Sequence, residues 1–232
     1  MTRVPVKICG VRDAGAIDAA VEGGARAVGF VFSSSPRCIG VDEAMTLARR
    51  VPDGVWRVGV FREIDTVVLA EVAQRGIVTH VQAEWMDESV VRAHSPGLAF
   101  IPVYRDVPTL RVELGEEATR EPRAFLVESA VSGVGMVPVW GRIARAGVGL
   151  AGVPGRAFIL AGGLKPVNVR GAILATGAGF VDVSSGVERS LGVKDAGLIG
   201  EFLAEARGGF AEASQPCVAE TARAGKSARV KP

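Results

Sequence analysis

The chain has 232 residues, of which 48% are hydrophobic and 22% charged, and this composition excludes an intrinsically disordered chain and a coiled coil. Its 27 lysines and arginines nearly balance its 25 aspartates and glutamates, so a dedicated nucleic-acid-binding protein is excluded as well. The sequence contains no run of about 18 apolar residues, the length that a membrane-spanning helix needs.

Short apolar, β-branched runs alternate with amphipathic stretches along most of the chain. In chain order, the apolar runs predict strands at Val4–Cys9, Ala27–Phe32, Val55–Phe61, Ile77–Gln82, Leu98–Tyr104, Ala124–Glu128, Arg156–Ala161 and Phe180–Val183. The stretches between them predict helices at 13–22, 43–51, 65–75, 165–175 and 195–207, the first with Asp13 as its N-cap. The helical segments expected after the fifth and sixth strands have the weakest patterns.

Eight strand–helix units in roughly 200 residues favour an α/β protein with the (β/α)8 TIM barrel fold, because a doubly wound sheet usually has five or six strands. Such barrels reach about 250 residues as one domain, so residues 1–207 are predicted to form a single barrel domain. Residues 208–232 lack periodicity and contain Pro216 and Pro232, and they are predicted to form a flexible C-terminal tail. A short helix over 211–222 is the alternative.

Two short segments rich in glycine and serine follow the last two predicted strands. Gly162 and Gly163 come after the seventh strand, and Ser184 and Ser185 come after the eighth. Glycine lets the backbone approach an oxyanion closely, and the loops after strands seven and eight are the recurrent phosphate site of such barrels. We therefore predict that these four residues bind a phosphate group, although one Gly-Gly pair alone would indicate only a turn.

Lys7 and Cys9 lie two residues apart on the first strand and therefore share one of its faces. A lysine beside a thiol lowers the pKa of the thiol and favours the basic thiolate. Because the eighth strand lies next to the first in a closed barrel, Asp182 is predicted to pair with Lys7 inside the barrel mouth. A buried, inert thiol is the alternative for Cys9, since free cysteines commonly behave as small apolar side chains.

Polar side chains at three other strand ends are candidates for contacts with a substrate. Arg37 follows the second strand, where its guanidinium suits a planar carboxylate, although a lone loop arginine is commonly just solvated. Glu128 ends the sixth strand and can serve as a general acid if burial raises its pKa, and a solvent-facing carboxylate is the alternative. Gln82 ends the fourth strand, and the nearby His80 is assigned a structural role.

The three cysteines occur at unrelated spacings, which argues against a disulfide framework and against a zinc site. The N-terminal segment lacks an apolar signal core, so a cytoplasmic protein is expected. No dinucleotide-binding pattern follows the first strand, and neither a cofactor nor a metal is predicted. The expected partner is a small molecule, with no nucleic acid and no membrane, and the sequence leaves the oligomeric state open.

Six segments spread along the chain match one family pattern in order. They are Val6-Lys7-Ile8-Cys9-Gly10-Val11, Gly29-Phe30-Val31-Phe32 with Ser35-Pro36-Arg37, Arg57-Val58-Gly59-Val60-Phe61, Leu160-Ala161-Gly162-Gly163-Leu164 with Pro166 and Asn168-Val169, Val181-Asp182-Val183-Ser184-Ser185-Gly186-Val187-Glu188, and Gly192-Val193-Lys194-Asp195. Together they cover roughly residues 4–207, and the chain resembles the phosphoribosylanthranilate isomerase family of tryptophan biosynthesis.

The resemblance implies a (β/α)8 barrel that catalyses an Amadori rearrangement without a cofactor. N-(5'-phosphoribosyl)anthranilate would be converted to 1-(2-carboxyphenylamino)-1-deoxyribulose 5-phosphate. By this resemblance Cys9 is the general base, and Glu128 stands where the family has its general acid. The implied substrate-binding residues are Arg37 at the anthranilate carboxylate, Asp182 at the ribose, and Gly162, Gly163, Ser184 and Ser185 at the phosphate. Lys7 and Gln82 complete the predicted binding residues.

The chain departs from the family pattern between the predicted strands four and six. The family aspartate is Glu128 here, which keeps the carboxyl group but moves it by about 1 Å, enough to change a rate about 10²-fold. The family's Gln-Leu-His-Gly reads Gln-Ala-Glu-Trp at 82–85, its lysine-containing loop is replaced at 132–140, and its strand-five lysine is Pro102. Besides a divergent isomerase, two alternatives therefore stay open: a non-catalytic barrel that binds a phosphoribosyl ligand, or an isomerase or lyase acting on another phosphosugar.

Overall fold

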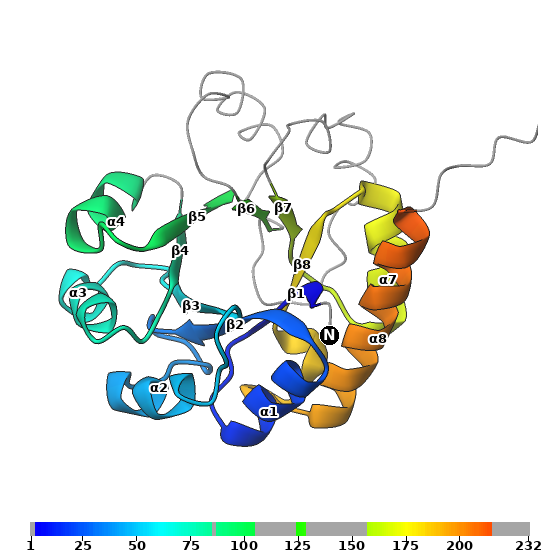
Figure 1. Ribbon diagram of the computed structural model, residues 1–232, viewed down its shortest axis with the longest axis horizontal. Helices are drawn as coiled ribbons and strands as arrows, with labels where there is room; N and C mark the ends of the chain where they lie inside the picture. The colour runs from blue at the N-terminus through cyan, green and yellow to red at the C-terminus, as the bar shows by residue number, and fades with distance from the viewer. Residues whose placement is uncertain (1–2, 85–86, 105–123, 129–156, 215–232) are drawn as a thin grey trace, which may run out of the picture.

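A computed structural model describes residues 3–84, 87–104, 124–128 and 157–214 of the chain. Eight parallel strands close into a barrel in chain order, with helices on its outside (Figure 1). The strands are β1 (Val4–Cys9), β2 (Ala25–Val31), β3 (Trp56–Val60), β4 (His80–Glu84), β5 (Ala99–Tyr104), β6 (Ala124–Val127), β7 (Ala157–Leu160) and β8 (Phe180–Val183). The predicted (β/α)8 TIM barrel is therefore confirmed.

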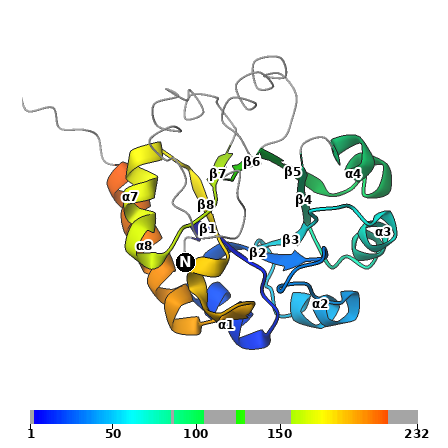
Figure 2. The ribbon, with the colours of Figure 1, turned by 180° about the vertical axis from the view of Figure 1, so that it is seen from behind.

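The described helices cover the outer face of the barrel, and both views show α7 and α8 side by side (Figures 1 and 2). They are α1 (Ala14–Glu22), α2 (Val41–Ala48), α3 (Thr66–Gln74), α4 (Glu88–His94), α7 (Pro166–Thr176) and α8 (Ala196–Ala213). Asp13, Asp65 and Asp195 cap α1, α3 and α8, because each carboxylate accepts a hydrogen bond from a first-turn backbone N–H. The helices expected after strands five and six, and the loop at 132–140, lie outside the described residues.

The strands separate two apolar clusters, one on each face of the closed sheet. The outer cluster packs strand side chains such as Ile8 and Phe30 against helix residues such as Ile17 and Ile199. The inner cluster fills the barrel with Val58, Ile101, Leu126, Ile159, Phe180 and their neighbours. Successive side chains of a strand point to opposite faces, so the nearly continuous apolar strands supply both clusters. The filled interior leaves the carboxyl ends of the strands as the place for polar side chains.

The fourth strand begins three residues later than its sequence pattern predicts, at His80 instead of Ile77. The Ile77 N–H donates to the Val72 carbonyl at 3.0 Å, and the Gly76 N–H donates to the Ala73 carbonyl at 3.1 Å. With Gly76 at a φ of 64°, these bonds close the C-terminus of α3. The apolar Ile77 is thus used to end the helix and fill the core, and Gln82 lies inside β4 instead of at its end.

The last helix does not end at residue 207 as predicted, and the flexible tail therefore does not begin at 208. Helix α8 continues to Ala213, and Gly209 permits its close crossing with α7. A Cβ on Gly209 would lie 3.1 Å from Ile173 Cδ1 and 3.2 Å from Arg170 Cα. Arg170 Nη2 also donates to Glu212 Oε2 at 2.8 Å, which joins this extension to α7. Residues 215–232, the rest of the predicted tail, lie outside the described part of the chain.

His80 belongs to an aromatic stack that is made by residues at the amino ends of three strands. The Trp56 ring stacks on His80 with centroids 4.4 Å apart and on Phe180 with centroids 5.4 Å apart. Burial, together with the charge of Arg26, lowers the pKa of His80 to about 4. This contact supports the structural role assigned to His80.

We expect His80 to make the fold sensitive to acid. A neutral imidazole is the folded form, so its contribution is fully present above the unfolded pKa of about 6.5 and is lost as the pH falls through about 4. The free energy of unfolding should decrease by about 1–3 kcal/mol over this range, to be measured by urea titration at pH 7 and pH 4. His80→Phe keeps an aromatic ring on Trp56 but cannot take up a proton, so it should remove the His80 contribution to the decrease in unfolding free energy. His94→Gln, at an exposed site, should keep it, and an equal decrease in both variants would contradict the assignment.

Candidate active site

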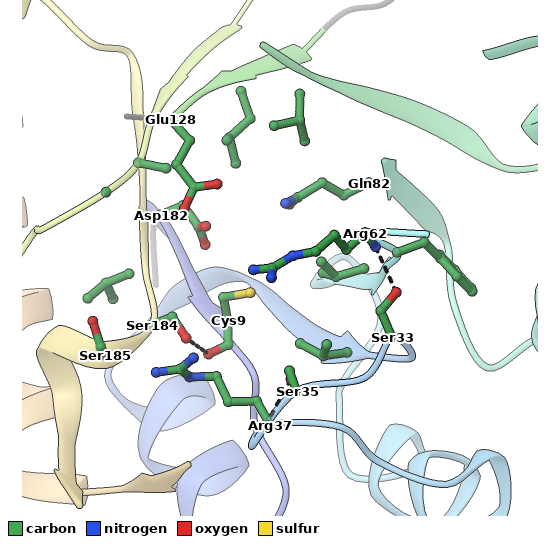
Figure 3. Close-up of a pocket in the computed structure, with 18 of the residues that line it drawn as sticks. Cys9, Ser33, Ser35, Arg37, Arg62, Gln82, Glu128, Asp182, Ser184 and Ser185 are labelled. Carbon is green, nitrogen blue, oxygen red and sulfur yellow. Dashed lines mark hydrogen bonds between the residues drawn. The ribbon is translucent and has the colours of Figure 1, made fainter. Parts of the chain in front are cut away.

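A pocket opens at the carboxyl ends of the barrel strands (Figure 3). Its polar lining consists of Cys9, Ser33, Ser34, Ser35, Arg37, Arg62, Gln82, Glu84, Glu128, Asp182, Ser184 and Ser185, with Gly162 and Gly163 supplying backbone. Every site residue that the sequence predicts is in this lining except Lys7. The closed barrel thus brings together residues that are up to 176 positions apart, Cys9 and Ser185.

The predicted Lys7–Asp182 pair is present and lies at the base of the pocket. Lys7 and Asp182 are register partners on the adjacent strands β1 and β8, and Lys7 Nζ donates to Asp182 Oδ1 at 2.9 Å. Burial by itself would lower the pKa of Lys7, but the Asp182 carboxylate and the Cys9 thiol reverse this and raise the pKa above its ordinary value. Lys7 is 0% exposed and therefore lies behind the pocket wall instead of in it. Lys7 was predicted to bind the ligand directly. The geometry instead makes it a partner of Asp182, outside the pocket lining.

Cys9 ends β1, and its Sγ points into the pocket (Figure 3). The residue is 7% exposed. Burial raises the pKa of the Cys9 thiol, and the Asp182 carboxylate adds to this, while the charges of Lys7 and Lys194 act in the opposite direction without cancelling it. The predicted lowering of this pKa is therefore wrong. The charge of Lys7 is held by Asp182, so its effect on the thiol is weaker than the loss of water.

The two predicted phosphate loops lie against each other. Gly162 and Gly163 have φ angles of 88° and 65°, in the left-handed region that favours glycine. The side chain of Asn168 braces this loop, because its Oδ1 accepts from the Lys165 N–H at 2.7 Å and its Nδ2 donates to the Gly163 carbonyl at 3.0 Å. Helix α7 begins directly after the loop, so its amino-terminal N–H groups and positive dipole end lie close to it.

The second loop passes through the 3-10 helix η2 (Ser185–Val187), which follows Ser184. A Cβ on Gly186 would collide with the Leu164 carbonyl, so only glycine lets the two loops meet here. The Ser184 hydroxyl donates to the Cys9 carbonyl at 3.1 Å, which ties the loop to the end of β1 (Figure 3). Backbone N–H groups and the Ser185 hydroxyl can thus bind one oxyanion beside the thiol, while the Ser184 hydroxyl fixes the loop.

Arg37 lies at the opposite side of the thiol from Gln82 in Figure 3. Arg37 Nε and Nη2 donate to the two carboxylate oxygens of Glu188 at 2.7 and 3.0 Å. Burial by itself would raise the pKa of Glu188, but the bonds from Arg37 and Lys194 lower it to about 2. Glu188 is therefore an anion at any physiological pH, and Arg37 is anchored at the pocket wall instead of being merely solvated.

Glu128 and Gln82 lie on the side of the pocket formed by β4 and β6. Glu128 directly follows β6, it is half-buried, and Figure 3 shows its carboxylate pointing into the pocket on the same side as Asp182. Gln82 is 8% exposed, and within the described part of the chain its Oε1 is buried without a hydrogen-bond partner. A buried polar atom without a partner is costly, so a donor group on a ligand would stabilise this side chain.

Several residues of the site were quoted in the sequence pattern without a role or were missed. Glu188 and Lys194 lie in the short antiparallel pair β9 (Glu188–Ser190) and β10 (Val193–Lys194), and both side chains are buried there. Ser33 accepts the Arg62 N–H at 2.7 Å and so shapes the loop after β3. No local pattern marks a charged residue in a short hairpin as buried, so only the packing of the hairpin on the barrel reveals these contacts.

Among the described residues, no group of three or more His, Cys, Asp or Glu side chains is placed to hold a metal ion. In the same part of the chain, every helix is too short or too polar to cross a membrane. The lining thus combines one thiol, three carboxylates (Glu84, Glu128 and Asp182), two guanidiniums (Arg37 and Arg62) and the two glycine- and serine-containing loops around one pocket. This set can bind a phosphorylated anion and move protons on it.

Comparison with known proteins matches this geometry to one family. The family model described as N-(5'-phosphoribosyl)anthranilate (PRA) isomerase matches residues 6–205. A protein of Methylibium petroleiphilum with that isomerase name is 34% identical over 209 residues, covering 88% of this chain and 94% of the relative. The isomerase of Acidithiobacillus ferrooxidans is 34% identical over 210 residues, covering 90% of this chain and 100% of the relative.

Solved structures agree with these sequence matches. The phosphoribosyl anthranilate isomerase of Thermotoga maritima superposes with a TM-score of 0.74 at 31% identity, covering 90% of this chain and 100% of that chain. A phosphoribosyl anthranilate isomerase in complex with reduced 1-(o-carboxyphenylamino)-1-deoxyribulose 5-phosphate superposes with a TM-score of 0.72 at 30% identity, with the same coverage.

Proposed function

This chain belongs to the N-(5'-phosphoribosyl)anthranilate isomerase family, and we propose that it converts N-(5'-phosphoribosyl)anthranilate to 1-(2-carboxyphenylamino)-1-deoxyribulose 5-phosphate, a step of tryptophan biosynthesis. The observation that carries this proposal is one pocket lined by Cys9 and Glu128 together with Gly163 and Ser184 of the two loops. Such a pocket supplies a base, an acid and a phosphate site to the same small molecule.

The substrate has two anionic ends, and the pocket offers a distinct site to each. The phosphate fits the N–H groups of Gly162 and Gly163 with the loop at Ser184 and Ser185, and the anthranilate carboxylate fits the guanidinium of Arg37. Asp182 lines the pocket beside the thiol, where the ribose would be, and Gln82 lies across the thiol from Arg37 (Figure 3). Lys7 contributes by holding the Asp182 carboxylate in place at 2.9 Å.

The reaction needs one proton delivered and one removed. Glu128 protonates the furanose ring oxygen, so the bond from that oxygen to C1' breaks and the nitrogen lone pair forms a Schiff base. Cys9, as the thiolate, then removes the proton from C2', which gives an enolamine. The enolamine tautomerises to the ketone by taking a proton at C1' and releasing the hydroxyl proton, and exchange with solvent restores the thiolate and the carboxylic acid.

The raised pKa of Cys9 is compatible with this role. Burial leaves less thiolate at neutral pH, but the thiolate that does form is a stronger base toward a carbon acid. Because catalysis needs Cys9 as a free thiol, we also propose that the protein works in a reducing compartment, which the cytoplasm provides.

Turnover of freshly made N-(5'-phosphoribosyl)anthranilate, followed by the loss of its fluorescence, tests the proposal. Glu128→Gln should lower kcat by about 10²–10³-fold, because it removes the proton that opens the ring while keeping the shape of the side chain. Glu128→Asp should keep or raise the activity, because it restores the carboxylate of the family pattern. Wild-type protein that binds the ligand without turnover would overturn the proposal in favour of a binding protein or another phosphosugar enzyme.

A further inference from the structure

We infer that Glu188 is a positioning residue, which orients Arg37 toward the substrate carboxylate and, through Lys194, holds the Ser184 loop at the phosphate. One buried anion would thereby set the distance between the two anionic subsites of the pocket. The inference rests on the proposed function, because it assigns Arg37 and Ser184 to the two ends of that substrate.

The contact between Glu188 and Arg37 decides which edge of the guanidinium faces the pocket. A guanidinium has two edges with parallel N–H groups that can receive a carboxylate. Glu188 occupies the edge formed by Nε and Nη2, at 2.7 and 3.0 Å. A substrate carboxylate would therefore meet the outer edge, formed by Nη1 and Nη2. Without Glu188, the long Arg37 side chain could adopt several rotamers, and its guanidinium would no longer be held in one orientation.

Lys194 extends the same network to the phosphate loop. Its Nζ donates to Glu188 Oε1 at 2.8 Å, to the Ser184 carbonyl at 2.9 Å and to Ser184 Oγ at 3.3 Å. Ser184 Oγ in turn donates to the Cys9 carbonyl at 3.1 Å. The N–H of Gly192 also donates to Glu188 at 3.2 Å, which holds the β9–β10 hairpin closed around the carboxylate. A continuous chain of hydrogen bonds thus links Arg37, the phosphate loop and the end of β1.

Burial and charge indicate that this network serves a ligand. The side chains of Glu188 and Lys194 are 4% and 1% exposed, and neither residue is part of the pocket lining. Glu188 therefore acts through the residues that it holds, and not by touching the substrate. Two cations surround one anion, so the network keeps a net positive charge, which suits a substrate that is anionic at both ends.

The substitution Glu188→Gln tests the inference. It keeps the shape of the side chain but removes the charge, and it places an amide N–H where Arg37 or Lys194 now donates. We expect KM to rise about 10–100-fold with kcat changed only a few-fold, because orientation of a carboxylate subsite affects the ground state and the transition state alike. The increase should be smaller in an Arg37→Met background than in the wild type, because only the part that acts through Lys194 and the Ser184 loop remains there.

The chain offers a matched control far from the pocket. Arg50 makes the same two-bond contact with Asp18, with Nε and Nη2 at 3.0 and 2.6 Å from its carboxylate oxygens. Asp18→Asn should leave KM unchanged, because that pair lies on the outer surface of the barrel. An unchanged KM in Glu188→Gln, or effects of Glu188→Gln and Arg37→Met that simply add, would overturn the inference.

Two further measurements keep the inference separate from folding and from the proposed function. If Glu188→Gln does not fold, Lys194→Met tests the inference in its place. The inference requires the KM of Lys194→Met to rise, and an unchanged KM would overturn the inference. Titration with reduced 1-(o-carboxyphenylamino)-1-deoxyribulose 5-phosphate measures binding without turnover. Wild-type protein that binds this ligand but lacks turnover contradicts the proposed function, and weaker binding by Glu188→Gln would still support the positioning role.

Discussion

Cys9→Ala is expected to lower kcat by about 10³-fold or more while the affinity for the product analogue changes little. General base catalysis typically contributes about 10²–10⁴-fold, and alanine leaves no group that can take the C2' proton. The Ser184 hydroxyl bonds to the Cys9 carbonyl and not to its side chain, so the phosphate loop should survive the substitution. Turnover and ligand titration on the same preparation check both parts. Cys38→Ala, at an exposed free cysteine, is the control and should keep wild-type activity.

The same thiol predicts how the rate depends on pH. Burial raises the pKa of Cys9, so the reactive thiolate is the minor form at neutral pH and increases as the pH rises. Because the mechanism also needs a protonated acid at Glu128, the base is isolated in Glu128→Gln, whose residual kcat/KM should increase with pH through the neutral range. Cys9→Ser should lose both the activity and its increase with pH, because a serine hydroxyl does not ionise in this range. A residual kcat/KM of Glu128→Gln that is flat from pH 6 to pH 9 would show that another group is the base.

Asp182→Asn is expected to lower the free energy of unfolding by about 3–5 kcal/mol, because it leaves the ammonium group of Lys7 buried without a counter-charge. Lys7 is 0% exposed, whereas the Asp182 side chain is 10% exposed and lines the pocket. Lys7→Met should therefore cost less than Asp182→Asn, since the stranded carboxylate can still reach water. Urea unfolding at pH 7 measures both variants.

The double variant Lys7→Met with Asp182→Asn should recover most of the stability that Asp182→Asn loses, because no buried charge remains. Glu88→Gln is the control: it breaks the surface pair with Arg92, and such exposed pairs contribute only about 0.3–0.5 kcal/mol. Equal losses for Asp182→Asn and Glu88→Gln would show that the buried pair does not stabilise the fold.

The sequence was most informative where strand periodicity and barrel closure act together. Lys7 and Cys9 share a strand face because side chains alternate, and Asp182 meets Lys7 because the eighth strand closes on the first. The place of Gly162, Gly163, Ser184 and Ser185 in the pocket lining was likewise predictable, since both pairs follow strands whose carboxyl ends meet at the mouth of the barrel. The family pattern then placed Arg37 and Glu128 at the mouth of the same barrel.

The sequence was less informative where one residue serves two elements. Ile77 continues an apolar run that predicts a strand, yet its N–H caps α3, so β4 begins only at His80. The loss of periodicity after residue 207 predicts the end of a helix, yet α8 crosses closely over α7 at Gly209 and continues to Ala213. In both places the packing of a neighbouring element outweighs the local preference of the chain.

The sequence by itself determined the barrel, the Lys7–Asp182 pair and the predicted site residues that line the pocket, because these follow from alternation, strand order and the family pattern. Only the tertiary structure decided the protonation of Cys9 and the partner of Arg37. The pKa of a thiol depends on how much water the surrounding atoms exclude, and burial raises it here despite the neighbouring lysine. Glu188 reaches Arg37 across 151 residues, a contact that exists only once the hairpin packs on the barrel.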